Sequence, residues 1–468
     1  EKGSNKCGIA NEPSYPTVSP ASRVASGSCS GSADPPAVGV CYRGTAGALG
    51  LTETVTLKLV EFDSSAGSAD VSGDGISAFT CSGKAFTKSG QDITLADASD
   101  CLPSGVTIKS VKYCSDDDTL AVSVADSAIP FPVSATLTKI DCASIGKDGL
   151  SEMWDLFKSN FEKDYNGDEA SRKEIFARNI EAIKEHNRKK EPYHLGVTKF
   201  ADLTKEEFAA TYLGYKSRGN NRWGAVPNLG THIHDGSALA AAVDWTTKGA
   251  VTGVKDQGQC GSCWAFSTTG SMEGAWQIAT GKLESLSEQQ LVDCDTADGG
   301  CQGGLMDTAF KYEEKSDVCT EASYPYKATG GSCKASSCTA AIPAGGVAGY
   351  KDVSGGESGL ASAVALTPVS VAIEADQSAF QLYSGGVMTG TCGTNLDHGV
   401  LAVGYGNDGT HDYWKVKNSW GSSWGESGYI RIEKGSNKCG IANEPSYPTV
   451  SPASRVVTSG SCSGSADP

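Results

Sequence analysis

Apolar and polar residues alternate in short runs through the N-terminal part of the chain. Between residues 38 and 142 such runs occur at 55–60, 106–112 and 120–124, and glycine, serine and aspartate separate them. Alternation with a period of two is typical of strands that bury one face. The pattern predicts a small β-sandwich or barrel within residues 27–146.

The next stretch carries apolar residues at helical spacing. Trp154, Phe157 and Phe161 recur every three or four residues, and the run at 172–187 repeats that interval. Such spacing places the larger side chains on one side of an amphipathic helix. Residues 147–240 are therefore expected to form a largely helical segment.

Residues 241–456 combine one long helical pattern with strand patterns. The helical pattern covers 264–280 and ends at Gly281, a residue type that often terminates helices. Strand-like runs follow at 400–405 and 413–417. This mixture predicts an α+β domain in which helices and sheet are segregated.

Composition narrows the class of protein. The chain has 468 residues, enough for about three domains, and its net charge of −16 disfavours a nucleic-acid partner. Its 17 cysteines indicate an oxidising, secreted or endolysosomal/vacuolar location. No apolar run is long enough to span a membrane, and the polar start does not read as a signal peptide.

A long-range repeat explains that polar start. Residues 1–24 recur identically at 433–456, which is 432 residues later. The simplest interpretation is one period cut from a tandem precursor, in which 1–26 is the tail of a preceding unit and 457–468 is the linker to the next. A sequence-assembly artefact, or a recent duplication without consequence, is the alternative.

Cys263 stands directly before the helical pattern at 264–280. A cysteine attacks a carbonyl carbon only as its thiolate, so a nucleophilic cysteine needs a group that lowers its pKa and a base nearby. The positive end of the helix dipole would stabilise the thiolate. The alternative is a structural or disulfide-linked cysteine, but residues 241–450 hold nine cysteines, and an odd number leaves one without an internal partner.

The base must come from elsewhere in the sequence. Residues 241–450 contain two histidines, of which His398 precedes the first strand-like run and His411 lies in a polar turn. His398 is therefore the candidate base, and His411 is interpreted as a surface residue. Asn418 follows the second strand-like run, where its amide would orient the imidazole while Trp420 shields that contact from water.

These residues resemble the papain-like cysteine proteases, nearest their cathepsin L-like branch. The resemblance rests on the segment 257–264, with its Cys-Gly-Ser-Cys-Trp signature, and on a histidine and an asparagine 135 and 155 residues after Cys263. It implies that Cys263 is the nucleophile, His398 the general acid/base and Asn418 the residue that orients it. It also assigns the oxyanion hole to the Gln257 amide and the Cys263 backbone N–H. No metal and no organic cofactor is implied.

The resemblance further implies a disulfide pairing in this domain. Three of the pairs are carried over from the family, a fourth is suggested by the two cysteines that then remain, and Cys263 is left over. The expected bridges are Cys260–Cys301, Cys294–Cys333, Cys392–Cys439 and the additional Cys319–Cys338.

Residues 147–240 resemble the inhibitory propeptide of the same family. Two substitutions depart mildly from its motifs: Asp168 stands where the family has glutamate and Thr198 where it has asparagine. The resemblance implies a prosegment that crosses the cleft in a non-productive direction and is removed by cleavage within 234–243. The matching positions are Arg172, Phe176, Asn179, Ile183 and Asn187 in the first motif, and Gly196, Phe200 and Asp202 in the second.

By the same resemblance, specificity depends on an apolar pocket for the second residue before the scissile bond. Glu444 falls at the expected floor of this pocket, where a carboxylate would add acceptance of arginine to that of leucine, phenylalanine or valine. The alternative is a glutamate that points to solvent. The expected substrate-binding residues are Leu305, Met306, Ala372, Gly399, Trp420 and Glu444.

The sequence thus predicts a cysteine endopeptidase zymogen with a papain-like two-lobed α+β fold, one helical lobe and one β-barrel lobe. A helical prosegment and a small disulfide-bonded all-β module precede it. Polypeptides are the expected substrates, and the propeptide is the expected intramolecular inhibitor. Two other interpretations remain: a latent structural or storage polyprotein, and a β-rich binding module carried by a protease.

Overall fold

The structure is a computed structural model of the chain. It describes residues 41–451 apart from 49–50, 63–65, 76–78, 90–91, 96–101, 103–105, 115–118, 127–132, 141–148 and 218–227. Of the two copies of the repeat, residues 1–24 lie outside the described residues, and 433–456 lies within them only up to Ser451. The tandem arrangement remains a prediction.

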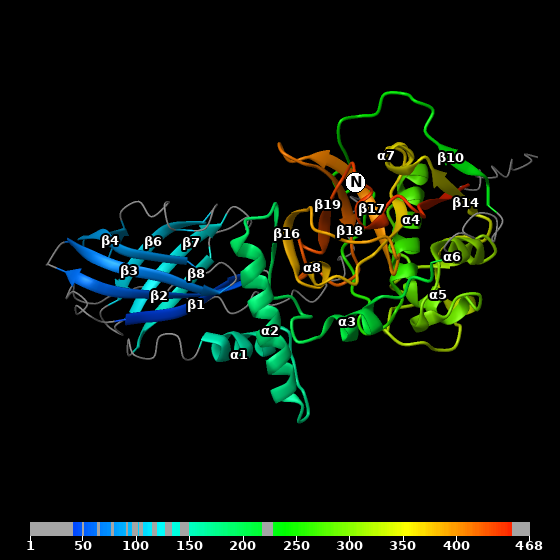
Figure 1. The fold of residues 1–468 in the computed structure, drawn as a ribbon. Helices are drawn as coiled ribbons and strands as arrows, with labels where there is room; N and C mark the ends of the chain where they lie inside the picture. Colours follow the sequence, from blue (N-terminus) through cyan, green and yellow to red (C-terminus); the bar gives the residue numbers. More distant parts are fainter. Residues whose placement is uncertain are drawn as a thin grey trace, which may run out of the picture. The chain divides into compact units, whose positions relative to one another are not determined.

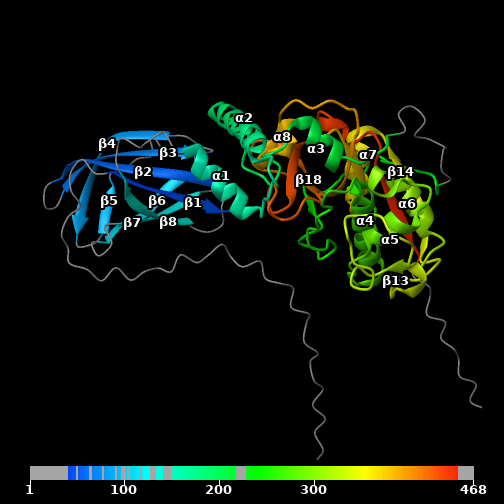
Figure 2. The same cartoon turned by 90° about the horizontal axis from the view of Figure 1, so that it is seen from below.

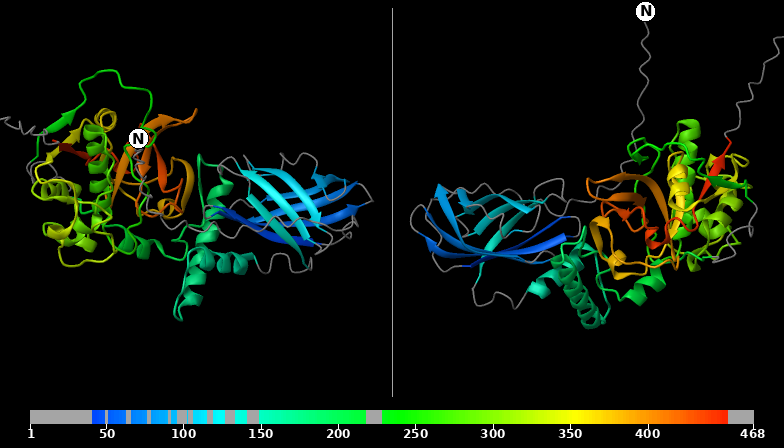
Figure 3. Two further views of the ribbon diagram at one scale, coloured as in Figure 1. Left: turned by 180° about the vertical axis from the view of Figure 1, so that it is seen from behind. Right: turned by 45° about the horizontal axis from the view of Figure 1, so that its top comes forward.

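The chain forms two compact units, and most of the first is a closed barrel of eight strands. The strands follow one another in chain order, and β1 pairs antiparallel with β8 to close the barrel. They are drawn in blue to cyan in Figure 1 and from two further directions in Figure 3. Their bounds are β1 Cys41–Ala48, β2 Leu51–Phe62, β3 Ala66–Gly75, β4 Phe79–Ser89, β5 Asp92–Leu95, β6 Val106–Cys114, β7 Thr119–Asp126 and β8 Val133–Ile140.

The barrel encloses an apolar core of its own. Val111 and Tyr113 of β6, and Leu120 and Val122 of β7, alternate along their strands and are buried together. This alternation is the period-two pattern that the sequence displays. The predicted β module is thus a barrel rather than a sandwich, and Cys41, like Cys81 of β4, is disulfide-bonded.

Helices are the main regular elements in the described part of the prosegment, and extended chain connects them. Helix α1, at Gly149–Asn160, belongs to the first compact unit, and everything from Asp164 onward belongs to the second. Within the second unit the prosegment forms α2 Glu169–Arg188, β9 Tyr193–Leu195, α3 Lys205–Tyr212 and β10 Thr231–Ile233.

The helices of the peptidase part include one long buried helix, against which others pack. Helix α4, at Cys263–Thr280, ends at Gly281, whose φ of 77° lies in the left-handed region that favours glycine. The predicted helix and its end are confirmed. Helices α5 and α6 lie beside α4 (Figure 2). The remaining helices are α5 Glu288–Cys294, α6 Met306–Glu313, α7 Gly356–Val364 and α8 Ser378–Gln381.

A ten-stranded sheet forms the rest of the peptidase part. Its order is β10-β14-β20-β15-β17-β18-β19-β16-β9, with β11 paired to β17, so the prosegment supplies the strand at each end. The predicted strand runs at 400–405 and 413–417 lie within β17 and β18. The bounds are β11 Val243–Asp244, β14 Val347–Ser354, β15 Val369–Ile373, β16 Tyr383–Met388, β17 His398–Asn407, β18 Asp412–Lys417, β19 Tyr429–Glu433 and β20 Ser446–Val450, with β12 Val318–Cys319 and β13 Ala340–Ile342 in a separate pair.

Four disulfides tie the peptidase part together, and Cys263 is a buried free thiol. Each bridge closes a loop of about 20 to 50 residues, which restricts the unfolded chain. The structure contains the bridges Cys260–Cys301, Cys294–Cys333, Cys319–Cys338 and Cys392–Cys439.

Candidate active site

Cys263 is the first residue of α4 and is completely buried. Its Sγ accepts a hydrogen bond from the backbone N–H of Gly399 at 3.4 Å. Since Gly399 follows His398 in β17, this contact brings the helix that carries the thiol against the strand that carries the imidazole. Residues 136 positions apart in sequence thus meet at one point.

The imidazole of His398 is held by an amide on the neighbouring strand. Its Nε2 lies 2.8 Å from Oδ1 of Asn418, which follows β18. Trp420 stacks on the ring, with centroids 4.6 Å apart, and covers this contact. Nδ1 of His398 has no hydrogen-bond partner among the described residues. One ring nitrogen is therefore fixed, and the other is left available for proton transfer.

Gln257 is anchored by both functional groups of its side chain. Its Oε1 accepts a hydrogen bond from the Ser419 hydroxyl at 2.7 Å, and its Nε2 donates to the Tyr212 carbonyl of the prosegment at 2.9 Å. Nε2 also donates to the Cys260 carbonyl at 2.9 Å. The amide expected in the oxyanion hole thus donates to a prosegment carbonyl in this structure. Ser419 adjoins Asn418 but was not among the residues predicted from the sequence, because no local pattern distinguishes it.

Burial sets the protonation of the two candidate catalytic groups. Burial raises the pKa of the Cys263 thiol to about 11, although the Gly399 and Gly214 backbone N–H groups oppose the shift. Burial likewise lowers the pKa of His398 to about 4, although the hydrogen bond that its ring donates to Oδ1 of Asn418 opposes the shift. A neutral thiol beside a neutral imidazole is the favoured pair while the cleft is covered.

The prosegment covers the cleft as an extended chain after α3. The Tyr215 N–H donates to the Asp397 carbonyl at 2.9 Å, and Gly214 and Lys216 exchange backbone hydrogen bonds with Gly304. Gly214 lies so close to Gly261 that a Cβ on it would come within 2.0 Å of the Gly261 carbonyl oxygen. The chain can pass here because Gly214 has no side chain.

Next to this crossing, the Tyr215 side chain enters the region predicted as the substrate pocket. Its hydroxyl donates to the Glu444 carboxylate at 2.5 Å, and the Ser217 hydroxyl donates to the other carboxylate oxygen at 3.2 Å. Tyr215 packs against an apolar cluster that includes Met306 and Ala372. Glu444 is therefore half-buried and accepts two hydrogen bonds from the prosegment, so it is not directed only to solvent.

Not every predicted pocket residue lies with Tyr215. Gly399 pairs with Ala372 across β15 and β17, and the Met306 sulfur would lie 3.2 Å from a Cβ at Gly399. Leu305, half-buried, precedes Met306. Trp420 instead stacks on His398 and meets the edges of Phe200 and Phe208 of the prosegment.

Several contacts hold the prosegment against the β-barrel lobe of the peptidase part. Arg172 makes a bidentate ion pair with Glu207, with oxygens at 2.8 and 2.9 Å, that joins α2 to α3. Thr198, which replaces the family's asparagine, donates to the Gln381 carbonyl at 2.8 Å. The Gln381 amide returns hydrogen bonds to the carbonyls of Phe200 and Leu203. Both departures from the propeptide motifs are therefore accommodated, since Asp168 also pairs with Arg172.

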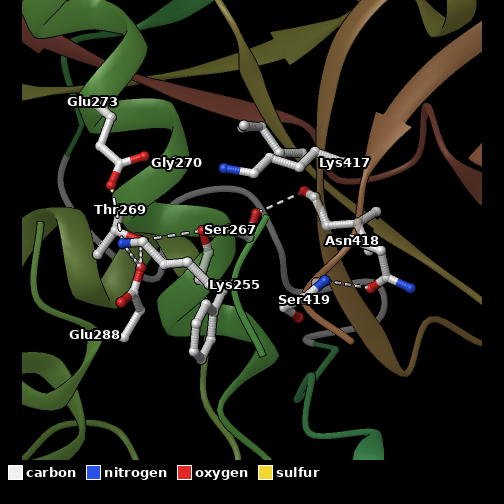
Figure 4. A pocket seen from close by; sticks show the side chains of 13 residues that line it. Lys255, Ser267, Thr269, Gly270, Glu273, Glu288, Lys417, Asn418 and Ser419 are labelled. Atoms are coloured by element: carbon white, nitrogen blue, oxygen red, sulfur yellow. Dashed lines mark hydrogen bonds and ion pairs between the residues drawn. The ribbon is translucent and has the colours of Figure 1, made fainter. Parts of the chain in front are cut away.

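Behind the candidate site lies a small pocket with charged walls (Figure 4). Lys255 pairs there with Glu273 at 3.1 Å and Glu288 at 2.6 Å, and both carboxylates are about 1% exposed. Burial alone would lower the pKa of Lys255, but the two carboxylates raise it. Lys417 of β18 lines the same pocket, next to Asn418. Charged side chains of both lobes therefore lie close to the residue that holds His398.

Removing the cation of this cluster is expected to destabilise the peptidase part strongly. Lys255→Met would leave two buried carboxylates without their partner, which typically costs about 3–5 kcal/mol of unfolding free energy. Lys282→Met is a matched control, because its ion pair with Glu284 is 3.8 Å long and its side chain is 76% exposed. That control is expected to cost at most about 1 kcal/mol. Denaturant unfolding of both variants in a Cys263→Ser chain measures the difference, and equal losses would contradict the prediction.

Comparison with known proteins agrees with this geometry. The family model for papain family cysteine proteases matches residues 239–449, and the model for the cathepsin propeptide inhibitor domain matches 154–208. Thiol protease SEN102 of Hemerocallis sp. is 48% identical over 338 residues, which are 69% of this chain and 92% of that protein. The chain belongs to the papain family of cysteine proteases.

Other papain-family proteins resemble the chain to a similar degree. Cysteine endopeptidase Rep1 of Oryza sativa subsp. japonica is 49% identical over 65% of this chain and 86% of its own length. The structure of digestive procathepsin L 3 from the larval midgut of Tenebrio molitor is 42% identical, with a TM-score of 0.58 over 64% of this chain and 99% of that one. The recognition, the two-lobed fold and the cysteine endopeptidase function with its propeptide inhibitor domain are thereby confirmed.

In the described part of the chain, no helix is long and apolar enough to cross a membrane. The same residues include no group of three His, Cys, Asp or Glu side chains that could hold a metal ion.

Proposed function

We propose that this papain-family endopeptidase works through Cys263, His398, Asn418 and Gln257, in the roles that the family resemblance implies. The observation that supports the proposal is the hydrogen bond from the Gly399 backbone N–H to the Cys263 sulfur, because Gly399 adjoins His398 and the His398 imidazole is hydrogen-bonded to Asn418. Once the cleft is exposed, the desolvation that keeps both groups neutral is relieved. Proton transfer from sulfur to Nδ1 then yields the thiolate and imidazolium that attack requires.

In the reaction, the thiolate sulfur bonds to the substrate carbonyl carbon. The negative charge moves to the carbonyl oxygen, where the Gln257 amide and the Cys263 backbone N–H donate hydrogen bonds to it. His398 gives its proton to the leaving nitrogen, so that the amine departs and a thioester remains. Water, deprotonated by the neutral imidazole, then releases the acid and the free thiol.

The prosegment keeps the enzyme latent by occupying these same positions. The Tyr212 carbonyl accepts the hydrogen bond of the Gln257 amide, and the Tyr215 hydroxyl donates a hydrogen bond to the Glu444 carboxylate. The prosegment passes Cys263 at Gly214 before it reaches the pocket, whereas a substrate presents its pocket residue before the scissile bond. It therefore runs opposite to a substrate. Its removal by cleavage within 234–243 activates the enzyme.

The basic test is hydrolysis of fluorogenic Phe-Arg and Arg-Arg dipeptides by the full chain before and after mild acid treatment. Activity that appears after acid and disappears with an epoxide thiol inhibitor is expected. Absence of activity in both conditions, with an unreactive Cys263, would favour the latent storage polyprotein.

Glu444 would give the pocket its acceptance of arginine. Replacing it by glutamine keeps the shape and removes the charge, so hydrolysis of Arg-Arg should fall about 10- to 100-fold in kcat/KM, as expected for loss of a charge-assisted hydrogen bond. Hydrolysis of Phe-Arg, whose pocket residue is apolar, serves as the control and should change little. An equal loss for both substrates would contradict the pocket assignment.

The endolysosomal or vacuolar interior, or the secretory route, is the location we propose. The four disulfides of the peptidase part need an oxidising compartment during folding. Polypeptides are the proposed partners there.

A further inference from the structure

Strand β10 binds the enzyme through an edge that is separate from the catalytic cleft. It pairs parallel with β14, with Thr231 opposite Asp352 and Ile233 opposite Ser354 (Figure 1). The chain just before it continues the pairing, since the Leu229 N–H donates to the Tyr350 carbonyl at 2.8 Å. Backbone hydrogen bonds thus carry much of the attachment, as they do when a peptide adds a strand to a sheet.

One side chain of this strand points inward and fills a polar niche. His232 is half-buried between exposed neighbours. Its Nε2 lies 3.0 Å from the Ser362 hydroxyl of α7, and its Nδ1 lies 3.2 Å from the Tyr447 hydroxyl of β20. Leu229 is a second contact: it lies over Gly349, where a Cβ would come within 2.9 Å of the leucine Cγ, and 49% of the residue stays exposed. The niche and the glycine belong to the enzyme and remain when the prosegment leaves.

We propose that the outer edge of β14, with the niche between Tyr447 and Ser362, is a second peptide-binding site of the matured enzyme. It takes an extended polypeptide segment that adds parallel to β14, with leucine over Gly349 and histidine three residues later in the niche. The chain's own residues 228–233 carry this pattern and are its prototype. The proposal rests on prosegment cleavage after residue 233, because an uncut strand would keep the edge occupied.

Acid weakens binding at this site. Burial lowers the pKa of His232, and the charges of Lys351 and His234 lower it further. The carboxylate of Asp235 opposes this shift. Tyr447 faces the ring as a neutral phenol. The bound imidazole is therefore preferred neutral. Binding is complete above the ordinary histidine pKa of about 6.5 and is lost as pH falls through the lowered value.

The test uses enzyme matured from the full chain, with Cys263 blocked by an epoxide thiol inhibitor. A fluorescent peptide of residues 228–235 is titrated into it and followed by anisotropy. We expect saturable binding at pH 7 that weakens about 5- to 30-fold when the histidine of the peptide is replaced by alanine, since one or two hydrogen bonds are lost. Ser362→Ala in the enzyme should weaken the parent peptide and leave the alanine peptide unaffected. Tyr447→Phe is the second enzyme variant.

Four results would overturn the proposal. These are the absence of saturable binding, equal affinity of the two peptides, equal binding of a scrambled peptide, and competition by a longer cleft inhibitor that fills the catalytic site. Mass spectrometry of the matured N-terminus tests the cleavage requirement separately, and an N-terminus at or before residue 233 would also overturn the proposal. Dipeptide hydrolysis by the same preparation, measured before blocking, shows whether the enzyme itself is active and keeps the two questions apart.

Discussion

Replacing Cys263 by serine should abolish peptide hydrolysis while leaving the zymogen folded. A hydroxyl does not ionise near neutral pH as a thiol beside an imidazole does, so the attacking anion is lost. Loss of a nucleophile typically lowers kcat by about 10⁵- to 10⁶-fold. The measurement is hydrolysis of the Phe-Arg substrate after addition of a trace of active enzyme to remove the prosegment in trans.

A matched pair of histidine variants completes this test. His398→Gln should lose activity to a comparable degree, because His398 is the histidine next to Gly399, whose N–H contacts the thiol. His411→Gln should retain activity, because His411 lies in a turn after β17. Substantial residual hydrolysis by Cys263→Ser, or inactivation by the change at His411, would show that the chemistry has been assigned to the wrong residues.

Cys263 should react much faster with alkylating reagents after removal of the prosegment than before it. With its pKa at about 11, Cys263 is a thiolate to only about 10⁻⁴ at pH 7 in the zymogen. Removal of the prosegment readmits water and permits the ion pair with His398. The rate of alkylation by iodoacetamide at pH 7 should therefore rise by at least about 10³-fold on maturation.

The Cys263→Ser chain provides the background for this measurement, since any alkylation of it arises from other sites. The pH dependence supplies an independent check. In the zymogen the rate should climb steadily up to about pH 11, whereas in the matured enzyme it should already be high near neutral pH. Equal rates before and after maturation would show that burial by the prosegment does not control the thiol.

The sequence allowed prediction of those features whose signals are local or follow the family pattern. The helix that begins at Cys263 and the strands around His398 and Asn418 show their periodicities directly, because each buries an apolar face. Three of the bridges followed from the resemblance, and the fourth was suggested by the two cysteines that remained. The two longer prosegment helices were equally visible, because one run of residues at helical spacing begins at Trp154 and another begins at Arg172.

Other features depend on contacts that no local pattern reports. Closure of the barrel requires β1 to meet β8 across almost the whole module, and both strands look like ordinary strands in sequence. Strands β9 and β10 have three residues each, too few to show alternation. Lys255 and Glu273 look like surface residues, since charged side chains are rarely buried unless paired, and the pairing is visible only in three dimensions.

Gly214 gives latency a basis separate from that of catalysis. The prosegment passes the thiol at a point where one added methyl group would collide with the backbone of Gly261. A change at this one codon would therefore leave every reacting group of the enzyme intact and still weaken the block on them. Selection can thus adjust how tightly the precursor is held without altering what the mature protease does.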